Sequence, residues 1–578
     1  MGLVAMFLVA ITKDEISQNF QHVTLEEFKI HSSVITIITD NFLSKYIPNE
    51  IGFSVIESPR FSSSSLENIF LSQFTYNEKD DTFSITRNPM SGRPIYYHIN
   101  SNGEFFCSSH IALLRKAGVP IEENIDVLPE FFVYRHVMPP NTLYKNINQL
   151  SLGCQLQFYI KNGESVIRSI NMYDLAVENQ NVKSIFDSSK KVYEYLNESI
   201  LQLSPYKDEI AVLLSGGLDS SLISRICMNN FSLKTSYSSG YPFESSWSNV
   251  EKKYAFSAAE ALGMNHHYYE PTTQEYLTGF LEAISLTEEP LHHLQSVLLH
   301  LLWKNEIPKN KKIILCGQGS GSVFGSNYFF YLNEHGNEMP FRLMFTKPGI
   351  NILRIISKVA GKGEELVDIM NKSTSEFLLS DPKNPIWSWM GYGSVDWVCN
   401  YFHVNEEDII KERYNFINRF CNRSIYDIWS LYSLFSDEDM TLSIWSKLGE
   451  GNNKIIYFPF YDLNLLNYVF SIPWKIKLQQ PKDILRKEIG RQSNIPEFIL
   501  TRPKSSFGIS SRFWAKKGGI FEPLIPLASK VFDEKEMRKM QSTDTKKAMT
   551  FWNILNYSIW KRLCINNEPL DVLLEELE

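Results

Sequence analysis

The stretch that decides the fold is Glu209-Ile210-Ala211-Val212-Leu213-Leu214-Ser215-Gly216-Gly217-Leu218-Asp219-Ser220-Ser221. Residues 210–214 are all apolar, which is typical of a strand buried on both faces. Small residues follow, and then Leu222, Ile223, Ile226 and Cys227 recur with the spacing of one helix face. The pattern predicts a buried strand that ends in a glycine-rich turn, which opens directly into a helix.

A turn of this kind is suited to bind phosphate, because its backbone N–H groups and the helix dipole favour an anion. Gly216 and Gly217 let the main chain approach a phosphate closely. Hydroxyl groups at Ser215, Ser220 and Ser221 can add hydrogen bonds. Asp219 is out of place beside an anion unless it holds a cation, and we expect Mg²⁺. The stretch lacks the GxxxxGK[ST] pattern, and the alternative is an ordinary tight turn with a capped helix.

Composition narrows the class of protein. The chain has 578 residues, enough for two to four domains. Lys and Arg number 57 and Asp and Glu 65, and this net charge of −8 argues against a nucleic-acid binder. Seven scattered cysteines form no CxxC pair, which disfavours a zinc ribbon and an iron–sulfur site. The apolar start lacks the layout of a signal peptide. We expect a soluble, cytoplasmic protein that binds neither nucleic acid nor membrane.

The chain changes character near residues 172–190. Before this boundary, short runs rich in β-branched and aromatic residues predict strands, including 33–38, 83–85, 95–99 and 155–160, with a hairpin turn at 100–103. Then Val192, Leu196 and Ile200 predict a helix over 184–203. Strands and helices alternate after it, and residues 350–440 are predicted to be mostly helical. We therefore expect one domain over 1–175 and another over 190–578.

The motif SGGLDSS at 215–221 resembles the pyrophosphate loop of the ATP pyrophosphatases, which adenylate a carbonyl oxygen and release pyrophosphate. Further segments resemble the asparagine synthetases of that superfamily, in the same order along the chain. They are Gly92–Tyr97, Pro140–Ile147, Leu233–Ser238, Glu251–Ala255, Glu288-Glu289-Pro290, Ile313–Gly325, Phe458–Asp462 and Arg502–Phe507. The resemblance covers nearly the whole chain.

This resemblance implies an α/β fold with two domains. The first would be a glutaminase-like (Ntn) α/β/β/α sandwich, and the second an adenine-nucleotide α-hydrolase-like domain with a parallel sheet. It also implies ATP and Mg²⁺, with Asp219 as a metal ligand and Lys504 as the catalytic residue that stabilises phosphate charge. The nucleotide would be held by Leu213, Leu214, Ser215, Gly216, Gly217, Leu218, Asp219, Ser220, Ser221, Ser238, Gly317 and Gln318.

The chain departs from the family pattern at three places. Gly2 stands where these glutaminases carry their catalytic cysteine, so we expect no glutamine hydrolysis, as in lasso-peptide cyclases and β-lactam synthetases. Gly321 and Ser322 stand where the family has acidic residues, and the loss of a carboxylate should weaken metal binding. Residues 455–462 lack the family's Glu and Arg. Gln318 replaces the tyrosine of a Tyr–Glu dyad, which disfavours β-lactam closure.

Three interpretations accompany these departures. The candidates to replace the missing metal carboxylate are Glu288, Glu289 and an aspartate from elsewhere in the chain. Glu450 is expected to be exposed in a loop, as charged loop residues usually are. The pairs His266-His267 and His292-His293 are interpreted as structural or rim residues, because neighbours in sequence do not face one metal together.

The leading hypothesis is an ATP-dependent ligase that forms an amide through an acyl-adenylate. Its substrates would be a carboxylate-bearing small molecule or peptide and an amine, as in lasso-type macrocyclisation, with a precursor peptide or a protease as partner. The narrower enzymatic alternative is an asparagine synthetase that uses ammonia. The alternative from another class is a degenerate paralogue that acts as a binding or accessory protein.

Overall fold

The structure is a computed structural model. It describes residues 7–12, 24–30, 33–39, 43–49, 52–58, 72–159, 164–169, 175–177, 184–241, 247–325, 355, 392–477, 484–502 and 511–578. Lys504 and Gly2, both singled out from the sequence, lie outside these residues.

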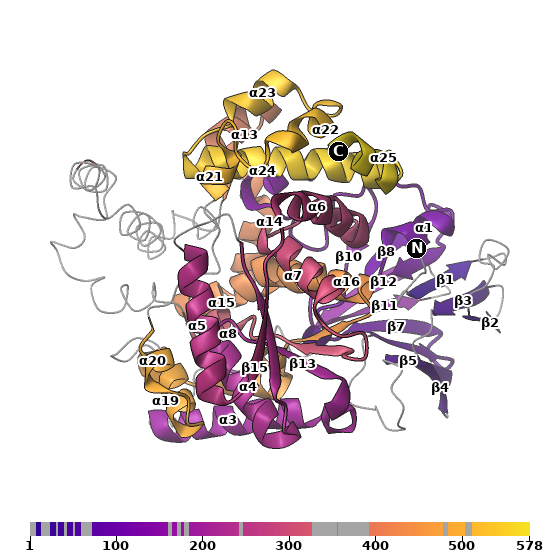
Figure 1. Ribbon diagram of the computed structural model, residues 1–578. Helices are drawn as coiled ribbons and strands as arrows, with labels where there is room; N and C mark the ends of the chain where they lie inside the picture. Colours follow the sequence, from indigo (N-terminus) through magenta and orange to yellow (C-terminus); the bar gives the residue numbers. More distant parts are fainter. Residues whose placement is uncertain are drawn as a thin grey trace.

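Two antiparallel sheets form the N-terminal part of the chain (Figure 1). The first sheet has the order β10 (Asn148–Gln149), β8 (Tyr96–Ile99), β9 (Phe105–Ser108), β1 (Phe7–Thr12), β3 (Ser33–Thr39), β2 (Thr24–Ile30). The second has the order β12 (Glu164–Ser169), β11 (Cys154–Tyr159), β7 (Thr82–Arg87), β6 (Ser72–Asn77), β5 (Gly52–Ser58), β4 (Leu43–Asn49). The predicted strands at 33–38, 83–85, 95–99 and 155–160 are confirmed within one or two residues.

The alternation of side chains along β1 explains how the sheets pack. Phe7 and Val9 belong to a core shared with Phe74 and Phe83 of the second sheet. Leu8, between them, belongs to the other core, with residues of the helices α1 and α2. One face of β1 therefore lies against the second sheet and the other against helices. Both sheets of the predicted sandwich, and its helical layer on the first sheet, are confirmed.

The second part of the chain is built on a parallel sheet of five strands. Their order is β15 (Asn265–Tyr269), β14 (Thr235–Ser239), β13 (Ile210–Leu213), β16 (Ile313–Leu315), β17 (Ile455–Tyr457). Since β13 is central, the loop after it lies between the loops that follow β14 and β16. In such sheets ligands bind beyond the carboxyl ends of the strands, so this edge positions the candidate site.

The described helices are α1 (Ile111–Lys116), α2 (Leu128–Tyr134), α3 (Ile185–Leu201), α4 (Leu218–Phe231), α5 (Trp247–Leu262), α6 (Thr273–Thr287), α7 (Gln295–Asn305), α8 (Ser320–Phe324), α13 (Val395–Phe402), α14 (Glu406–Asn418), α15 (Ile425–Ser433), α16 (Asp439–Gly451), α17 (Leu463–Ser471), α18 (Trp474–Lys477), α19 (Ile484–Gln492), α20 (Glu497–Leu500), α21 (Ser511–Ala515), α22 (Ile525–Ser529), α23 (Glu534–Lys539), α24 (Thr545–Trp560) and α25 (Leu570–Leu577). The predicted helix over 184–203 is α3, with Ser184 as its N-cap. One π-helical turn, Leu434–Glu438, joins α15 to α16.

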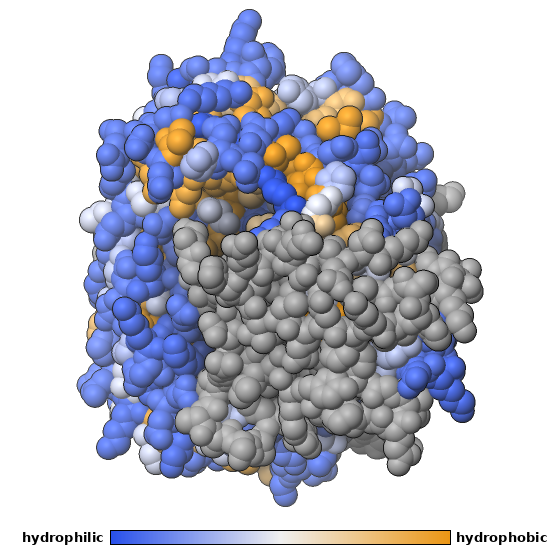
Figure 2. All heavy atoms as spheres, turned by 90° about the vertical axis from the view of Figure 1, so that its right-hand side faces the viewer, coloured by the Kyte–Doolittle hydropathy of each residue, from blue (hydrophilic) through white to orange (hydrophobic). Residues whose placement is uncertain are grey.

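Helices cover both faces of the parallel sheet. His266 of β15 packs edge-on against Phe256 of α5, with ring centroids 5.1 Å apart. On the opposite face, the Ser239 hydroxyl donates to the carbonyl of Leu298 in α7 at 3.5 Å. Figure 1 shows the C-terminal helices α21–α25 together at one end of the molecule. Within the described residues we find no apolar helix of membrane-spanning length. Among the coloured residues of the face in Figure 2 most are hydrophilic, and hydrophobic side chains gather in the upper part.

One stripe of α16 joins the two parts of the chain. Asp439, Ser443, Lys447 and Glu450 follow one another at spacings of three or four residues, and all four are buried. Arg87 donates to Asp439 at 2.6 Å and to Ser443 at 2.8 Å. The expectation that Glu450 lies exposed in a loop is wrong, because α16 continues through it.

The rest of this stripe completes the contact. Glu450 is only 3% exposed and pairs with Arg93 at 3.1 Å. Lys447 pairs with Glu288 at 3.0 Å, and the Glu288 carboxylate accepts from the backbone N–H groups of Ile111 and Ala112 at 2.8 and 2.7 Å. The interface is therefore built from buried charges that are matched across it.

Candidate functional site

The glycine-rich loop adopts the predicted strand–turn–helix conformation. β13 ends at Leu213 and α4 begins at Leu218. Gly216 has φ +74°, and a Cβ there would lie 2.4 Å from the Tyr254 carbonyl on α5. No other residue type fits, because a side chain would meet the α5 backbone and strain φ. The sequence therefore folds a tight cradle at the N-terminus of α4.

Hydrogen bonds between its own side chains hold the loop in shape. The Ser220 hydroxyl lies 3.1 Å from that of Ser215 and donates to the Gly217 carbonyl at 3.2 Å. The Ser215 N–H donates to the Ser220 hydroxyl at 3.2 Å, and the Gly217 N–H donates to the Ser215 hydroxyl at 3.4 Å. An anion that enters the cradle would replace these weak internal contacts with charge-assisted ones.

The predicted nucleotide residues come together at the ends of three adjacent strands. A Cβ on Gly317, after β16, would lie 3.2 Å from the Ser220 N–H nitrogen, so this loop abuts the start of α4. Ser238 is in β14, beside β13. Leu214 is fully buried, and its N–H donates to the Tyr237 carbonyl at 2.9 Å, which fixes the start of the loop to β14.

Ser238 is held by the half-buried His266. Its hydroxyl lies 2.7 Å from Nε2 of His266, and the Ser236 hydroxyl lies 2.9 Å from Nδ1 of the same ring. Burial, together with the neighbouring His267, lowers the pKa of His266 to about 4. The neutral His266 imidazole, with both nitrogens bonded, is structural, whereas His267 is exposed and pairs with Glu306 at 3.0 Å.

Asp219 points at an arginine that the sequence argument did not single out as a site residue. Arg486 in α19 donates from Nε to Asp219 Oδ1 at 3.0 Å, and from Nη2 to Oδ2. A second arginine, Arg502, donates to the Ser215 carbonyl at 3.3 Å and lies 4.0 Å from the centre of the Tyr254 ring. Guanidinium groups thus flank the loop on two sides.

A buried carboxyl lies beside the loop that follows β16. Glu438 accepts from Gln318 Nε2 at 2.8 Å, from the Ser322 hydroxyl at 3.2 Å and from Tyr461 at 3.3 Å. Burial, and then the charge of Asp437, raise the pKa of Glu438 to about 7 despite these donors. The sequence motif left Gln318 without a glutamate partner, and the structure supplies one from the turn before α16.

The two glutamates expected to replace the missing metal carboxylate lie elsewhere. Glu288 pairs with Lys447 and caps α1, and Glu289 accepts from the Tyr96 hydroxyl at 3.2 Å. Burial raises the pKa of Glu289 to about 7, although Lys447 lowers it. Both carboxyls therefore serve the interface with the N-terminal sheets, and the interpretation that either holds metal is wrong.

The residues of the glycine-rich loop fit a nucleoside triphosphate better than they fit a magnesium ion. The loop offers a glycine cradle, serine hydroxyls and a helix N-terminus, which together suit phosphate. For Mg²⁺, the carboxylate of this loop is Asp219, and both of its oxygens accept from Arg486. A metal ion would have to displace a guanidinium there, so the arrangement does not fit Mg²⁺ on Asp219.

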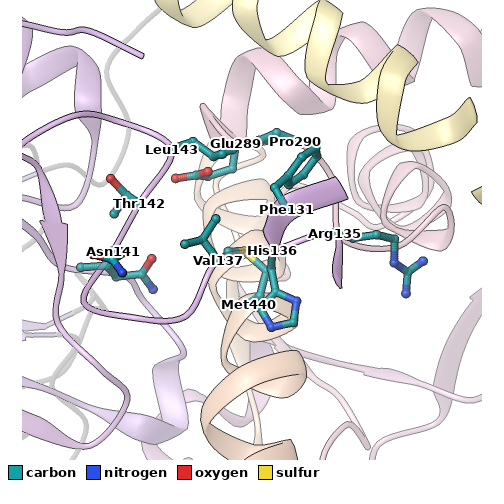
Figure 3. Close-up of a pocket in the computed structure, with 11 residues that line it drawn as sticks. Phe131, Arg135, His136, Val137, Asn141, Thr142, Leu143, Glu289, Pro290 and Met440 are labelled. Carbon is teal, nitrogen blue, oxygen red and sulfur yellow. The ribbon is translucent and has the colours of Figure 1, made fainter. Parts of the chain in front are cut away.

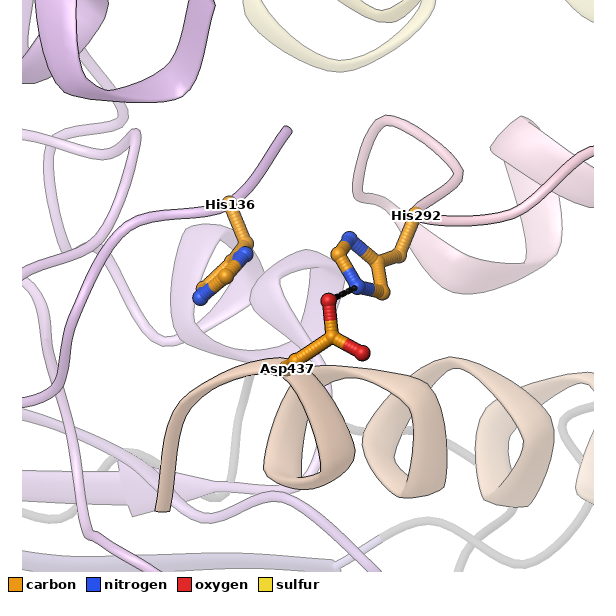
Figure 4. Close-up of side chains that lie close together, drawn as sticks. All are labelled: His136, His292 and Asp437. Carbon is orange, nitrogen blue, oxygen red and sulfur yellow. Dashed lines mark hydrogen bonds and ion pairs between the residues drawn. The ribbon is translucent and has the colours of Figure 1, made fainter. Parts of the chain in front are cut away.

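A second cluster, His136, His292 and Asp437, is shown in Figure 4. One ligand atom from each residue lies within 4.8 Å of the others. However, His136 Nδ1 lies 2.9 Å from the Tyr134 carbonyl, which only accepts, so Nδ1 carries the proton. The lone pair on Nε2 then faces Arg413 Nη2 at 3.3 Å. A metal ion would have to displace this guanidinium as well.

Asp437 is satisfied by hydrogen bonds. It accepts from His292 Nε2 at 2.7 Å and from the Tyr392 hydroxyl at 3.0 Å. Burial alone would raise the pKa of Asp437, but the imidazoles outweigh it and hold the pKa well below its usual value. We interpret the cluster as a structural network, as predicted for the pair at 292 and 293.

A small pocket lies between the segment 131–149 and α16, next to Glu289 (Figure 3). Its lining includes His136, Thr142 and Met440, and it contains none of the predicted nucleotide residues. It therefore belongs to the interface of the two parts of the chain and not to the glycine-rich loop.

Comparison with known proteins agrees with this arrangement. The sequence profile of the asparagine synthase family matches residues 191–387 and 456–562, and that of the glutamine amidotransferase domain matches residues 64–169. Asparagine synthetase (glutamine-hydrolyzing) 3 of Bacillus subtilis (strain 168) is 23% identical over 451 residues, which cover 75% of this chain and 66% of that enzyme. Asparagine synthetase (glutamine-hydrolyzing) 1 of the same strain is 23% identical over 465 residues, covering 76% and 68%.

A putative asparagine synthetase (glutamine-hydrolyzing) of Mycobacterium tuberculosis (strain ATCC 25618 / H37Rv) is 20% identical over 515 residues, which cover 85% of this chain and 76% of that protein. The chain spans about two thirds of the length of the Bacillus relatives.

Proposed function

The chain belongs to the asparagine synthase family, whose sequence profile matches more than half of its length, and from this premise we propose that it is an ATP-dependent carbon–nitrogen ligase. The observation that carries the proposal is the cradle at Ser215–Ser221, which offers a helix N-terminus and glycine backbone at the carboxyl edge of a parallel sheet.

The first half-reaction activates a carboxylate. A substrate carboxylate oxygen attacks the α-phosphorus of ATP, a new P–O bond forms, and the bond to the β-phosphate oxygen breaks to release pyrophosphate. The cradle binds the leaving phosphates, and Lys504 stabilises their charge. Mg²⁺ bound in the ATP chelate would neutralise part of the triphosphate charge.

The second half-reaction forms the amide. An amine nitrogen attacks the acyl carbon, the C–N bond forms, the C–O bond to AMP breaks, and the nitrogen gives up a proton. We assign Glu438 as the acceptor, because its carboxyl lies beside Gln318 at the predicted nucleotide loop. Its pKa of about 7 suits a group that takes up a proton near neutral pH.

The substrates we propose are a carboxylate-bearing small molecule or peptide and an amine already present in the substrate or a partner, as in lasso-type macrocyclisation with a precursor peptide and a partner protease. This proposal keeps the expectation, drawn from Gly2, that the chain does not hydrolyse glutamine. The names of the relatives support a second candidate, an asparagine synthetase that takes free ammonia.

Two assays test the proposal. Exchange of labelled pyrophosphate into ATP reports adenylation, and hydroxamate formation with hydroxylamine reports capture of the acyl group. We expect Glu438→Gln to retain exchange and to lose amide formation about a hundredfold or more. Glu289→Gln is the matched control, because Glu289 is equally buried but faces Tyr96.

The substrate screen separates the candidates. Aspartate with ammonium supports the synthetase, and a peptide carboxylate supports the cyclase. Failure of the chain to bind ATP at millimolar concentration would exclude both, and would leave the accessory protein.

A further inference from the structure

Among the described residues, the positive charge that contacts Asp219 is the guanidinium of Arg486. Arg486 makes a two-point contact with the Asp219 carboxylate, one bond from Nε and one from Nη2. The pair is largely shielded from water, since the Arg486 side chain is 6% exposed and that of Asp219 is 23% exposed. A two-point contact fixes the plane of the guanidinium as well as its position.

The backbone of α19 fixes where Arg486 can reach. Gly490 lies one helical turn after Arg486, on the same face. A Cβ on Gly490 would lie 2.9 Å from the side chain of Leu218, the first residue of α4 and the neighbour of Asp219. The glycine therefore lets α19 approach the start of α4 closely, and this approach carries Arg486 to the mouth of the cradle.

We propose that Arg486 is a phosphate-binding residue of the nucleotide site and that Asp219 positions it. The proposal rests on the proposed function for the identity of the ligand, ATP. Asp219 is in the first turn of α4, where the N–H groups favour an anion. A guanidinium held beside that turn adds a positive charge close to the same anion, and guanidinium and phosphate match in geometry.

Charge supports the same assignment. A divalent ion held by two carboxylates carries no net charge, and neither does the Arg486 guanidinium paired with the Asp219 carboxylate. Gly321 and Ser322 bring no carboxylate to this edge of the sheet, and the nearby Glu438 faces Gln318, Ser322 and Tyr461. A metal held by protein carboxylates would need a second ligand here that the sequence does not provide. Arg486 brings positive charge to the phosphates without such a ligand.

The experiment measures binding and not turnover. Titration calorimetry on the full chain would use three probes, ATP, inorganic tripolyphosphate and adenosine, each in EDTA and in Mg²⁺. The variants are Arg486→Met, Arg486→Lys, Asp219→Asn and the double variant Arg486→Met/Asp219→Asn. Arg491→Met is the matched control, because it removes an arginine from the same helix that is 42% exposed and pairs with Glu488.

We expect Arg486→Met to weaken ATP and tripolyphosphate about tenfold or more in both buffers, and to leave adenosine unchanged. Arg486→Lys restores part of this loss, and Arg491→Met binds as the wild type does. The two single substitutions are not additive in the double variant, since Asp219 acts through Arg486. The double variant removes both charges of the pair, so a melting temperature equal to that of the wild type would show that its loss of binding is not loss of folding.

A different pattern overturns the proposal. If Asp219 were a metal ligand, Asp219→Asn would weaken ATP only in Mg²⁺, and Arg486→Met would bind ATP normally in EDTA. The two proposals also fail separately. A wild-type chain that binds tripolyphosphate through Arg486 but forms no AMP overturns the ligase and retains the phosphate site. If the Arg486→Met variant adenylates a substrate as well as the wild type does, the phosphate site is overturned and the ligase is retained.

Discussion

Arg87, at the end of strand β7, donates to Asp439, at the start of helix α16, across 2.6 Å, and neither side chain is more than 1% exposed. The guanidinium also donates to the carbonyls of Arg93, Leu150 and Gly92. All of these hydrogen bonds are buried, so water cannot replace them when the guanidinium is removed.

Arg87→Met should therefore cost about 3–5 kcal/mol of unfolding free energy, because it leaves Asp439 buried and unpaired. The pair variant Arg87→Met/Asp439→Leu should cost less than the single one. Urea unfolding followed by circular dichroism measures both. Arg538→Met, in an exposed pair with Glu534, is the control and should leave the midpoint unchanged. An equal loss in the single and pair variants would contradict the buried-charge account.

Gly216→Ala should abolish ATP binding, because its Cβ would overlap the Tyr254 carbonyl. Gly263→Ala is the matched control, since Gly263 has φ +70° but no atom within 4 Å of the added Cβ. The control carries only the strain of the backbone, about 1 kcal/mol, and should bind ATP normally. Calorimetric titration of both variants with ATP separates the overlap with Tyr254 from backbone strain. Equal affinities of the two variants for ATP would show that the overlap does not matter.

Stability should fall as pH rises toward neutrality. Burial raises the pKa of Glu438 from 4.5 to about 7, and that of Glu289 likewise, so both are protonated in the fold at pH 5 but ionised in the unfolded chain. The two protonated carboxyls contribute fully to the free energy of unfolding below pH 4.5. This contribution is lost as pH rises through 7, and its upper bound is about 3 kcal/mol for each group. Unfolding at pH 5 and pH 7.5 should show a smaller difference for Glu438→Gln than for the wild type. An equal change in unfolding free energy between the two pH values in both proteins would show that Glu438 does not cause the pH dependence.

Metal removal should leave the His136, His292 and Asp437 cluster intact. His136 already faces Arg413 and the Tyr134 carbonyl with its two ring nitrogens. His292 Nε2 donates to Asp437. Dialysis against EDTA should not lower the melting temperature, and added Zn²⁺ should not raise it through these residues. A rise that disappears in His292→Gln would establish a metal site here.

The sequence predicted what depends on local pattern. The strand before Ser215, the helix after it and the alternation along the sheets follow from hydrophobic period and turn chemistry, which act over a few residues. It failed where contacts join distant residues. Arg486 is 267 positions from Asp219, and Glu438 is 120 from Gln318.

At Glu450 the local sequence predicted the wrong secondary structure. Glycines and asparagines around it predict a loop, but the helix continues, because Gly449 and Gly451 let α16 pack closely on Ile456 and Leu286. Tertiary packing outweighs the local preference of these residues. The residue is then brought to a partner, Arg93, which lies far away in the sequence.

The stripe on α16 also makes the two parts of the chain depend on each other. The helix that begins next to Glu438 is the one that buries Asp439, Lys447 and Glu450 against the N-terminal sheets. Removal of those sheets would expose this row of charges on α16 and take away the two arginines that pair with its carboxylates, so the N-terminal sheets act as a foundation for the helix that carries Glu438.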